Sequence, residues 1–177
     1  MKNKTYYITI ILLIIVAVSM RLLDHPVNFT PLGALAFFTA LYLPRRYAIV
    51  LPIFALCISD IFIGFYAWQM MCAVYGSFII VALIALYVKK HKSFAYILGG
   101  TVLGSILFFL ITNMAVWIFG TMYTHDFGGL LQSYYMAIPF FRNSLLGDLF
   151  YTSIFVGTME FMMHTMQIKN FDTVQIK

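Results

Sequence analysis

Six apolar stretches, separated by short polar breaks, constrain this chain more than any other feature of its sequence. A helix rises 1.5 Å per residue, so about 20 apolar residues cross the roughly 30 Å hydrocarbon core of a bilayer. We therefore expect an all-α fold, a polytopic membrane bundle of six transmembrane helices in a single domain over residues 1–177. The predicted spans are about 6–23, 31–43, 47–66, 70–88, 94–120 and 143–163.

The second stretch is short for a membrane span, at about 20 Å for a helix over 31–43. We expect Thr30 to cap this helix and Pro31 to be its first residue, since these residue types favour those positions. Its entry loop is expected to dip into the membrane.

Composition excludes several classes of protein. Only 10% of the residues are charged, against about 25% in soluble domains, so membrane lipid is an expected partner. The net charge of +5 is spread over short loops and forms no basic face for nucleic acid. Cys57 and Cys72 lack metal-site spacing, and no hydrolase or metalloprotease motif is present. We expect neither a metal, nor a cofactor, nor an enzymatic activity.

The basic residues predict the orientation of the chain. With six spans, nine of the eleven lysines and arginines fall on one side, and only Arg21 and Arg142 fall on the other. Basic loops stay in the cytoplasm by the positive-inside rule. We therefore expect a multi-pass protein of the inner (plasma) membrane with both termini in the cytoplasm.

Polar groups gather in the outward half of the predicted bundle. The segment 140–151 places Arg142, Asn143 and Asp148 at the head of an apolar run, and Asn143 is a possible N-cap that leaves Arg142 free to turn inward. Charges at such depth cost at least about 2.5–3.5 kcal/mol on insertion scales, so they mark ion pairs or ligand sites. Four further residues share this depth or the loops above it: Asn28, Asp60, Asn113 and Trp117.

Two interpretations of this cluster stay open. Asp60 and Asp148 balance Arg21 and Arg142 in charge, so the four can form two structural ion pairs. In the other interpretation the cluster lines a pocket for a small-molecule substrate. Arg142 and Asn143 would then bind its polar or anionic groups, and Asn113 and Asn28 would add hydrogen bonds. The rings of Trp117, Tyr134 and Tyr135 would cover its apolar part.

Several motifs carry a resemblance to a known family. They are the segments 28–34, 75–77 and 138–148, Ser59-Asp60 with Gly64, and Thr112-Asn113 with Trp117. Together they resemble a bacterial family of uncharacterised membrane proteins that is similar to the substrate-binding S components of energy-coupling factor (ECF) vitamin transporters. The resemblance implies six helices, cytoplasmic termini and a vitamin-sized pocket near the outer face.

The same resemblance implies a function and a partner. An S component binds its substrate for import and docks on an ECF energising module through an Ala-xxx-Ala motif in the first helix. Here the nearest such pair is Ala36 and Ala40 in the second span, which leaves that docking open. The family is also somewhat similar to the solitary cobalamin transporters, which use a cysteine in the membrane to ligate cobalt. Cys57 is the candidate for that role, and a plain buried cysteine is the alternative interpretation. A non-catalytic structural or assembly subunit of the cell envelope is the alternative function.

Overall fold

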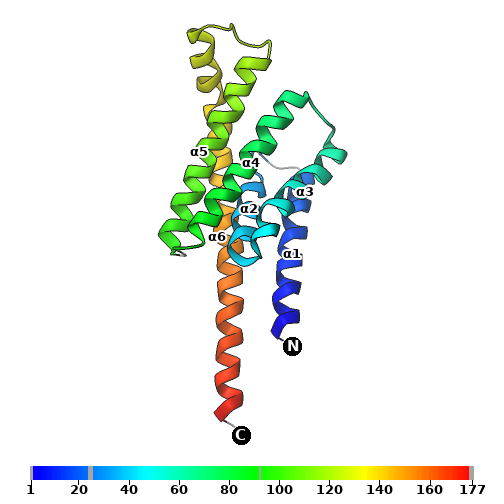
Figure 1. Cartoon of the computed structure of the whole chain (residues 1–177), viewed down its shortest axis with the longest axis vertical. Helices are drawn as coiled ribbons and strands as arrows, with labels where there is room; N and C mark the ends of the chain where they lie inside the picture. Colours follow the sequence, from blue (N-terminus) through cyan, green and yellow to red (C-terminus); the bar gives the residue numbers. More distant parts are fainter. Residues whose placement is uncertain (1, 24–25, 92, 176–177) are drawn as a thin grey trace.

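The protein is an all-helical bundle. The computed structural model describes residues 2–23, 26–91 and 93–175, and in those residues it contains six helices and no strand (Figure 1). This confirms the predicted fold class. The helices are α1 (Lys2–Leu22), α2 (Leu32–Tyr42), α3 (Arg45–Ile63), α4 (Trp68–Val88), α5 (Phe94–Phe119) and α6 (Phe127–Gln175).

Four helices in the described part of the chain, α1, α3, α4 and α5, are long and apolar enough to cross a membrane. Their outward faces carry large apolar side chains such as Phe54, Phe62 and Leu110. Exposed apolar surface of this kind is unfavourable in water and suits a lipid environment. The chain is therefore built as a membrane bundle.

Helix α2 is the centre of the bundle. All of its residues are buried, and it contacts each of the other five helices. Those five form a ring in which α1 contacts α3, α3 contacts α4, α4 contacts α5, α5 contacts α6, and α6 contacts α1. Phe37, Phe38 and Leu35 supply the largest apolar side chains of this core, which explains why α2 is apolar on every face.

The two ends of α2 meet polar groups from other helices. At its C-terminal end, Lys89 donates a hydrogen bond to the carbonyl of Leu43 at 2.8 Å, and the Tyr42 hydroxyl donates to Glu160 at 2.6 Å. A cation near the C-terminus of a helix is favourable because carbonyl groups there lack helical partners. The expected Thr30 cap is wrong: Pro31 occupies the cap position, and no side chain caps the helix.

Helix α6 differs from the sequence prediction. It begins at Phe127 and continues through Pro139, so Arg142 and Asn143 lie inside a helix. The expectations that Asn143 caps the last span and that Arg142 belongs to an entering loop are therefore wrong. Proline removes one helical hydrogen bond, and membrane helices tolerate it where neighbouring groups compensate. The predicted span 143–163 lies within this longer helix.

Candidate functional site

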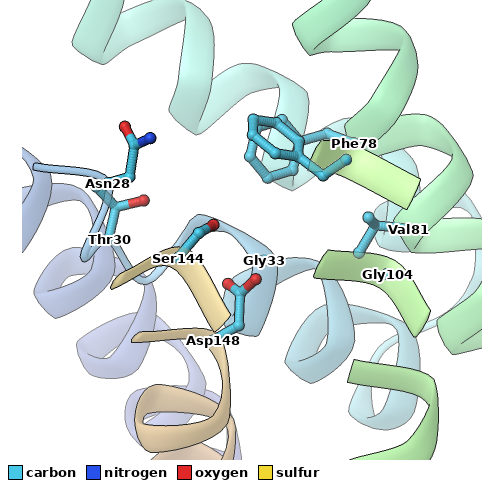
Figure 2. Close-up of a pocket in the computed structure, with 9 residues that line it drawn as sticks. Asn28, Thr30, Gly33, Phe78, Val81, Gly104, Ser144 and Asp148 are labelled. Atoms are coloured by element: carbon cyan, nitrogen blue, oxygen red, sulfur yellow. The ribbon is translucent and has the colours of Figure 1, made fainter. Parts of the chain in front are cut away.

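The shortness of α2 creates a cavity in the bundle. Its 11 residues extend only about 16 Å, whereas α4, α5 and α6 continue past its N-terminal end (Figure 1). The space beyond that end is lined by the loop before α2 and by the three longer helices (Figure 2). A small lobe of about 60 Å³ is bounded by residues that include Asn28, Thr30, Gly33, Phe78, Ser144 and Asp148.

A second lobe of about 250 Å³ adjoins the first. The two lobes share Asn28, Phe108 and Ser144 as lining residues. Phenylalanines dominate the wall of the larger lobe, which also carries Thr112 and Asn113. The cavity therefore has a small end that carries Asp148 and three other polar side chains, and a larger, mostly apolar end, which is the usual make-up of a small-molecule site.

Asp148 is the charged residue of the small lobe. It accepts a hydrogen bond from the Ser105 hydroxyl at 2.7 Å, and its carboxylate lies against Gly33 in the first turn of α2 (Figure 2). Glycine is required there, because a β-carbon at position 33 would stand 2.7 Å from the carboxylate carbon of Asp148. Among the described residues no basic side chain forms an ion pair with Asp148.

Three polar side chains beside Asp148 also lack protein partners. Within the described part of the chain, the side chains of Asn28, Thr30 and Ser144 make no hydrogen bond. Ser144 contrasts with Ser77 and Ser153, whose hydroxyls donate to the carbonyl four residues earlier. Asn28 is exposed, and Thr30 and Ser144 are half-buried, so their polar atoms are free to bind water or a ligand that enters the cavity.

Asn28 holds an uncommon backbone conformation. Its φ of 63° lies in the left-handed region, which asparagine enters more readily than most residues other than glycine. The loop then turns into α2 and approaches α6 closely: a β-carbon at Gly147 would stand 3.2 Å from the Cα of Phe29. This turn places the Asn28 amide on the wall of both lobes.

Asp60 belongs to a separate cluster. Its carboxylate accepts from Arg21 at 2.7 Å and from the Tyr75 hydroxyl at 2.8 Å. Arg21 also contacts the Ser59 hydroxyl and donates to the carbonyl of Leu56 at 3.2 Å. With Asp60 only 1% exposed, this network is an ion pair that joins α1, α3 and α4, and Asp60 does not line either lobe.

The other predicted site residues lie outside the cavity. Arg142 is exposed and has no side-chain partner among the described residues, while Asn143 donates to the carbonyl of Val27 at 3.0 Å. Trp117 donates to the carbonyl of Thr124 at 2.9 Å and so braces the loop between α5 and α6. Of the seven predicted residues, the structure brings together Asn28, Asn113 and Asp148.

The cysteine hypothesis is not supported by the geometry. Cys57 is exposed on the surface of α3, and it lines neither lobe. The expectation of a buried cysteine one turn from Asp60 is wrong for a simple reason. A residue three positions away is rotated by about 60° around the helix, and here that rotation carries it from the interior to the outside of the bundle.

Sequence reasoning missed several residues of the site. Gly33, Thr30, Phe78 and Ser105 line the small lobe or contact Asp148. Thr30 and Gly33 lie in the motif 28–34 but were not assigned to a site, and Phe78 and Ser105 have no distinctive sequence pattern. One signal was present for Ser144, which shares the helix face of Asp148 at a spacing of four residues.

Comparison with known proteins places the whole chain in one family. The sequence profile of the family of unknown function DUF6580 matches residues 1–171. The chain belongs to DUF6580. No curated protein and no solved structure matches the chain.

Proposed function

We propose that this protein is the substrate-binding membrane component of an importer for a small, vitamin-like molecule. The substrate binds in the two-lobed cavity beyond the N-terminal end of α2. The observation that carries this proposal is the gathering of Asn28, Thr30 and Ser144, whose side chains make no hydrogen bond within the described residues, beside the Asp148 carboxylate on the cavity wall. Because these side chains are exposed or half-buried and make no hydrogen bond within the described bundle, they are available to bind a ligand.

The proposed orientation follows from the ends of the helices. Both termini lie at the end of the bundle opposite the α5–α6 loop (Figure 1). Arg45 and Arg46 begin α3, and Lys89 and Lys90 follow α4, so all four basic residues lie at that same end. By the positive-inside rule this end faces the cytoplasm. The cavity then opens toward the outer half of the inner membrane, where an importer first meets its substrate.

The resemblance to ECF S components supports the same proposal. Two of its segments, 28–34 and 138–148, supply walls of the small lobe, including Asn28 and Asp148. An energising module remains the proposed partner for release of the substrate into the cytoplasm. In this proposal Asn28, Asn113 and Asp148 contact the substrate, and the phenylalanines of the larger lobe cover its apolar part.

A substrate can be sought directly by mass spectrometry of small molecules retained by the purified protein. Ser144→Leu fills the small lobe and should abolish retention. Ser153→Leu makes the same change on the exposed face of α6 and should leave retention unchanged. Equal retention by wild type and Ser144→Leu, or none by either under gentle extraction and after incubation with a vitamin mixture, would rule the proposal out.

One observation favours the alternative function, a structural or assembly subunit of the cell envelope. Helix α6 extends well beyond the rest of the bundle (Figure 1), and Phe161, next to the Glu160 that contacts Tyr42, is 74% exposed. An extension of this kind suits a protein partner. Crosslinking from position 161 in cells separates the two functions: a stable envelope-protein adduct together with an empty cavity favours the alternative.

A further inference from the structure

The Asp148 carboxylate has little to balance its charge. Within the described residues it has one hydrogen-bond donor, Ser105, at 2.7 Å, and no ion pair. Asp60, the other acid inside the bundle, has both a guanidinium and a tyrosine hydroxyl. The two acids thus have very different surroundings, and the one with fewer partners is the one that lines the cavity.

The N-terminal end of α2 offsets part of this charge. Asp148 lies against Gly33 in the first turn, where the helix dipole favours a negative group. Such an interaction is modest, and a single hydrogen bond to a charged group is also modest. Removing a carboxylate from water carries the larger penalty. A positive group in the small lobe is the missing complement.

The size of the small lobe limits what that positive group can be. Its volume of about 60 Å³ exceeds the 10–15 Å³ that one water needs by the same kind of measure. It therefore holds a head group of a few heavy atoms, such as a protonated amine. The apolar body attached to such a head has to lie in the adjoining lobe of about 250 Å³.

The walls suit both parts of such a molecule. An ammonium group donates up to three hydrogen bonds, and Asn28, Thr30 and Ser144 offer oxygen acceptors beside Asp148. The rings of Phe78 and Phe108 border the same lobe, with centroids 5.2 Å apart. Aromatic faces attract cations, most strongly where water is excluded.

We infer that the substrate class is a cationic amine with an apolar or aromatic body, and that Asp148 binds its ammonium group. This inference rests on the proposed function and names the substrate class of the same cavity. It also gives Asp148 and Asn113 different roles: Asp148 selects the charged head, and Asn113 lies in the lobe that holds the body.

The test uses three probes of similar shape: 2-phenylethylamine, 2-phenylethanol and phenylacetate. Binding to the full-length protein in mild detergent is measured by calorimetry and by thermal shift. The amine should bind at least about tenfold more tightly than the alcohol or the acid, as expected for one charge-assisted contact. Asp148→Asn should remove this preference. Asp126→Asn, which changes net charge equally outside the cavity, should keep it.

A second variant keeps the inference testable if Asp148→Asn does not fold. Ser105→Ala removes the one hydrogen-bond donor to Asp148 among the described residues and leaves the carboxylate in place, so the amine should raise the melting temperature more than in wild type. No amine preference in wild type, a preference that survives in Asp148→Asn, or equal protection by sodium chloride would overturn the inference.

Failure of the inference is distinguishable from failure of the proposed function. If phenylacetate, the alcohol or a retained neutral or anionic molecule binds and Ser144→Leu abolishes that binding, the cavity is a substrate site but not an amine site. If no probe binds and no molecule is retained, both the inference and the proposed function are wrong.

Discussion

Among the described residues, Arg21 and Asp60 form an ion pair inside the bundle, with 2.7 Å between Nη2 and Oδ1. The pair joins α1 to α3, and the Tyr75 hydroxyl extends it to α4 at 2.8 Å. The side chain of Asp60 is 1% exposed and that of Arg21 14%. Because both are well shielded from water, removing one partner leaves the other without compensation.

The first prediction concerns this pair. Asp60→Ala should destabilise the protein by about 3–5 kcal/mol, because it leaves Arg21 charged and unpaired in the bundle. Arg21→Met in the same chain should restore part of the loss. The measurement is thermal unfolding in detergent for both single variants and the double variant. Strictly additive effects would show that the two residues are not energetically coupled.

The second prediction concerns Gly33 and Asp148. Gly33→Ala should lower stability, because its β-carbon would overlap the Asp148 carboxylate. The same change should be far better tolerated in an Asp148→Ala background, where that carboxylate is absent. Gly76→Ala is the control, since nothing lies within 4 Å of a β-carbon built there. A cost for Gly33→Ala that is unchanged by Asp148→Ala would contradict the packing described.

The third prediction concerns pH and Asp126, which precedes α6 in an exposed loop. Its side chain accepts from the backbone N–H of Gly129 at 2.7 Å and from the Thr124 hydroxyl at 3.1 Å. These hydrogen bonds lower the pKa of Asp126 below its ordinary value. The charged form therefore stabilises the folded loop above the ordinary aspartate pKa, and this contribution is lost as the pH falls through the lowered value.

Trp117 reports on this loop through its hydrogen bond to the carbonyl of Thr124. In a Trp68→Phe background, its fluorescence should change on acidification only below the usual aspartate range. Asp126→Asn should remove that acid transition while still capping α6, since asparagine is also a good cap. A transition of the same midpoint in Asp126→Asn would assign it to another group.

The fourth prediction concerns Arg142, which the sequence suggests as a clamp for an anionic group. Because Arg142 is exposed and lies outside both lobes, Arg142→Lys and Arg142→Ala should leave ligand affinity unchanged. Their effect on stability should stay within about 0.5 kcal/mol, as for most surface changes. Loss of binding in Arg142→Lys without loss of stability would restore the sequence-based role.

The fifth prediction concerns topology. After both native cysteines are replaced by serine, single cysteines are placed at positions 126 and 90. An impermeant thiol reagent added to intact cells should label position 126, and it should reach position 90 only after the membrane is opened. Labelling of both from outside would contradict the proposed orientation.

The sequence alone predicts the helical architecture well, because apolar runs of 18 or more residues have few alternative structures. It also places Asn28, Asn113 and Asp148 at one depth. It does not predict the direction in which each side chain points. Arg142 and Asp148 are six residues apart, about 120° around a helix, and only packing decides which of them faces the interior.

The sequence also does not predict that α6 continues through Pro139. Pro139 and the glycines before it are ordinary signals for a break. Contacts of α6 with α5 and α2 support the helix across that position. The cavity is harder still to predict, since it arises from an element that is too short. A gap left by α2 among longer helices is a property of the assembled bundle.

The length of α6 also has a mechanical consequence. The helix is joined to the end of α2 by the hydrogen bond between Tyr42 and Glu160. Measured from this pivot, the arm to Asp148 is about 18 Å and the arm to Gln175 about 22 Å, at 1.5 Å per residue. The two arms are nearly equal, so a rigid tilt of α6 about this contact would displace the two ends of the helix by similar distances in opposite directions.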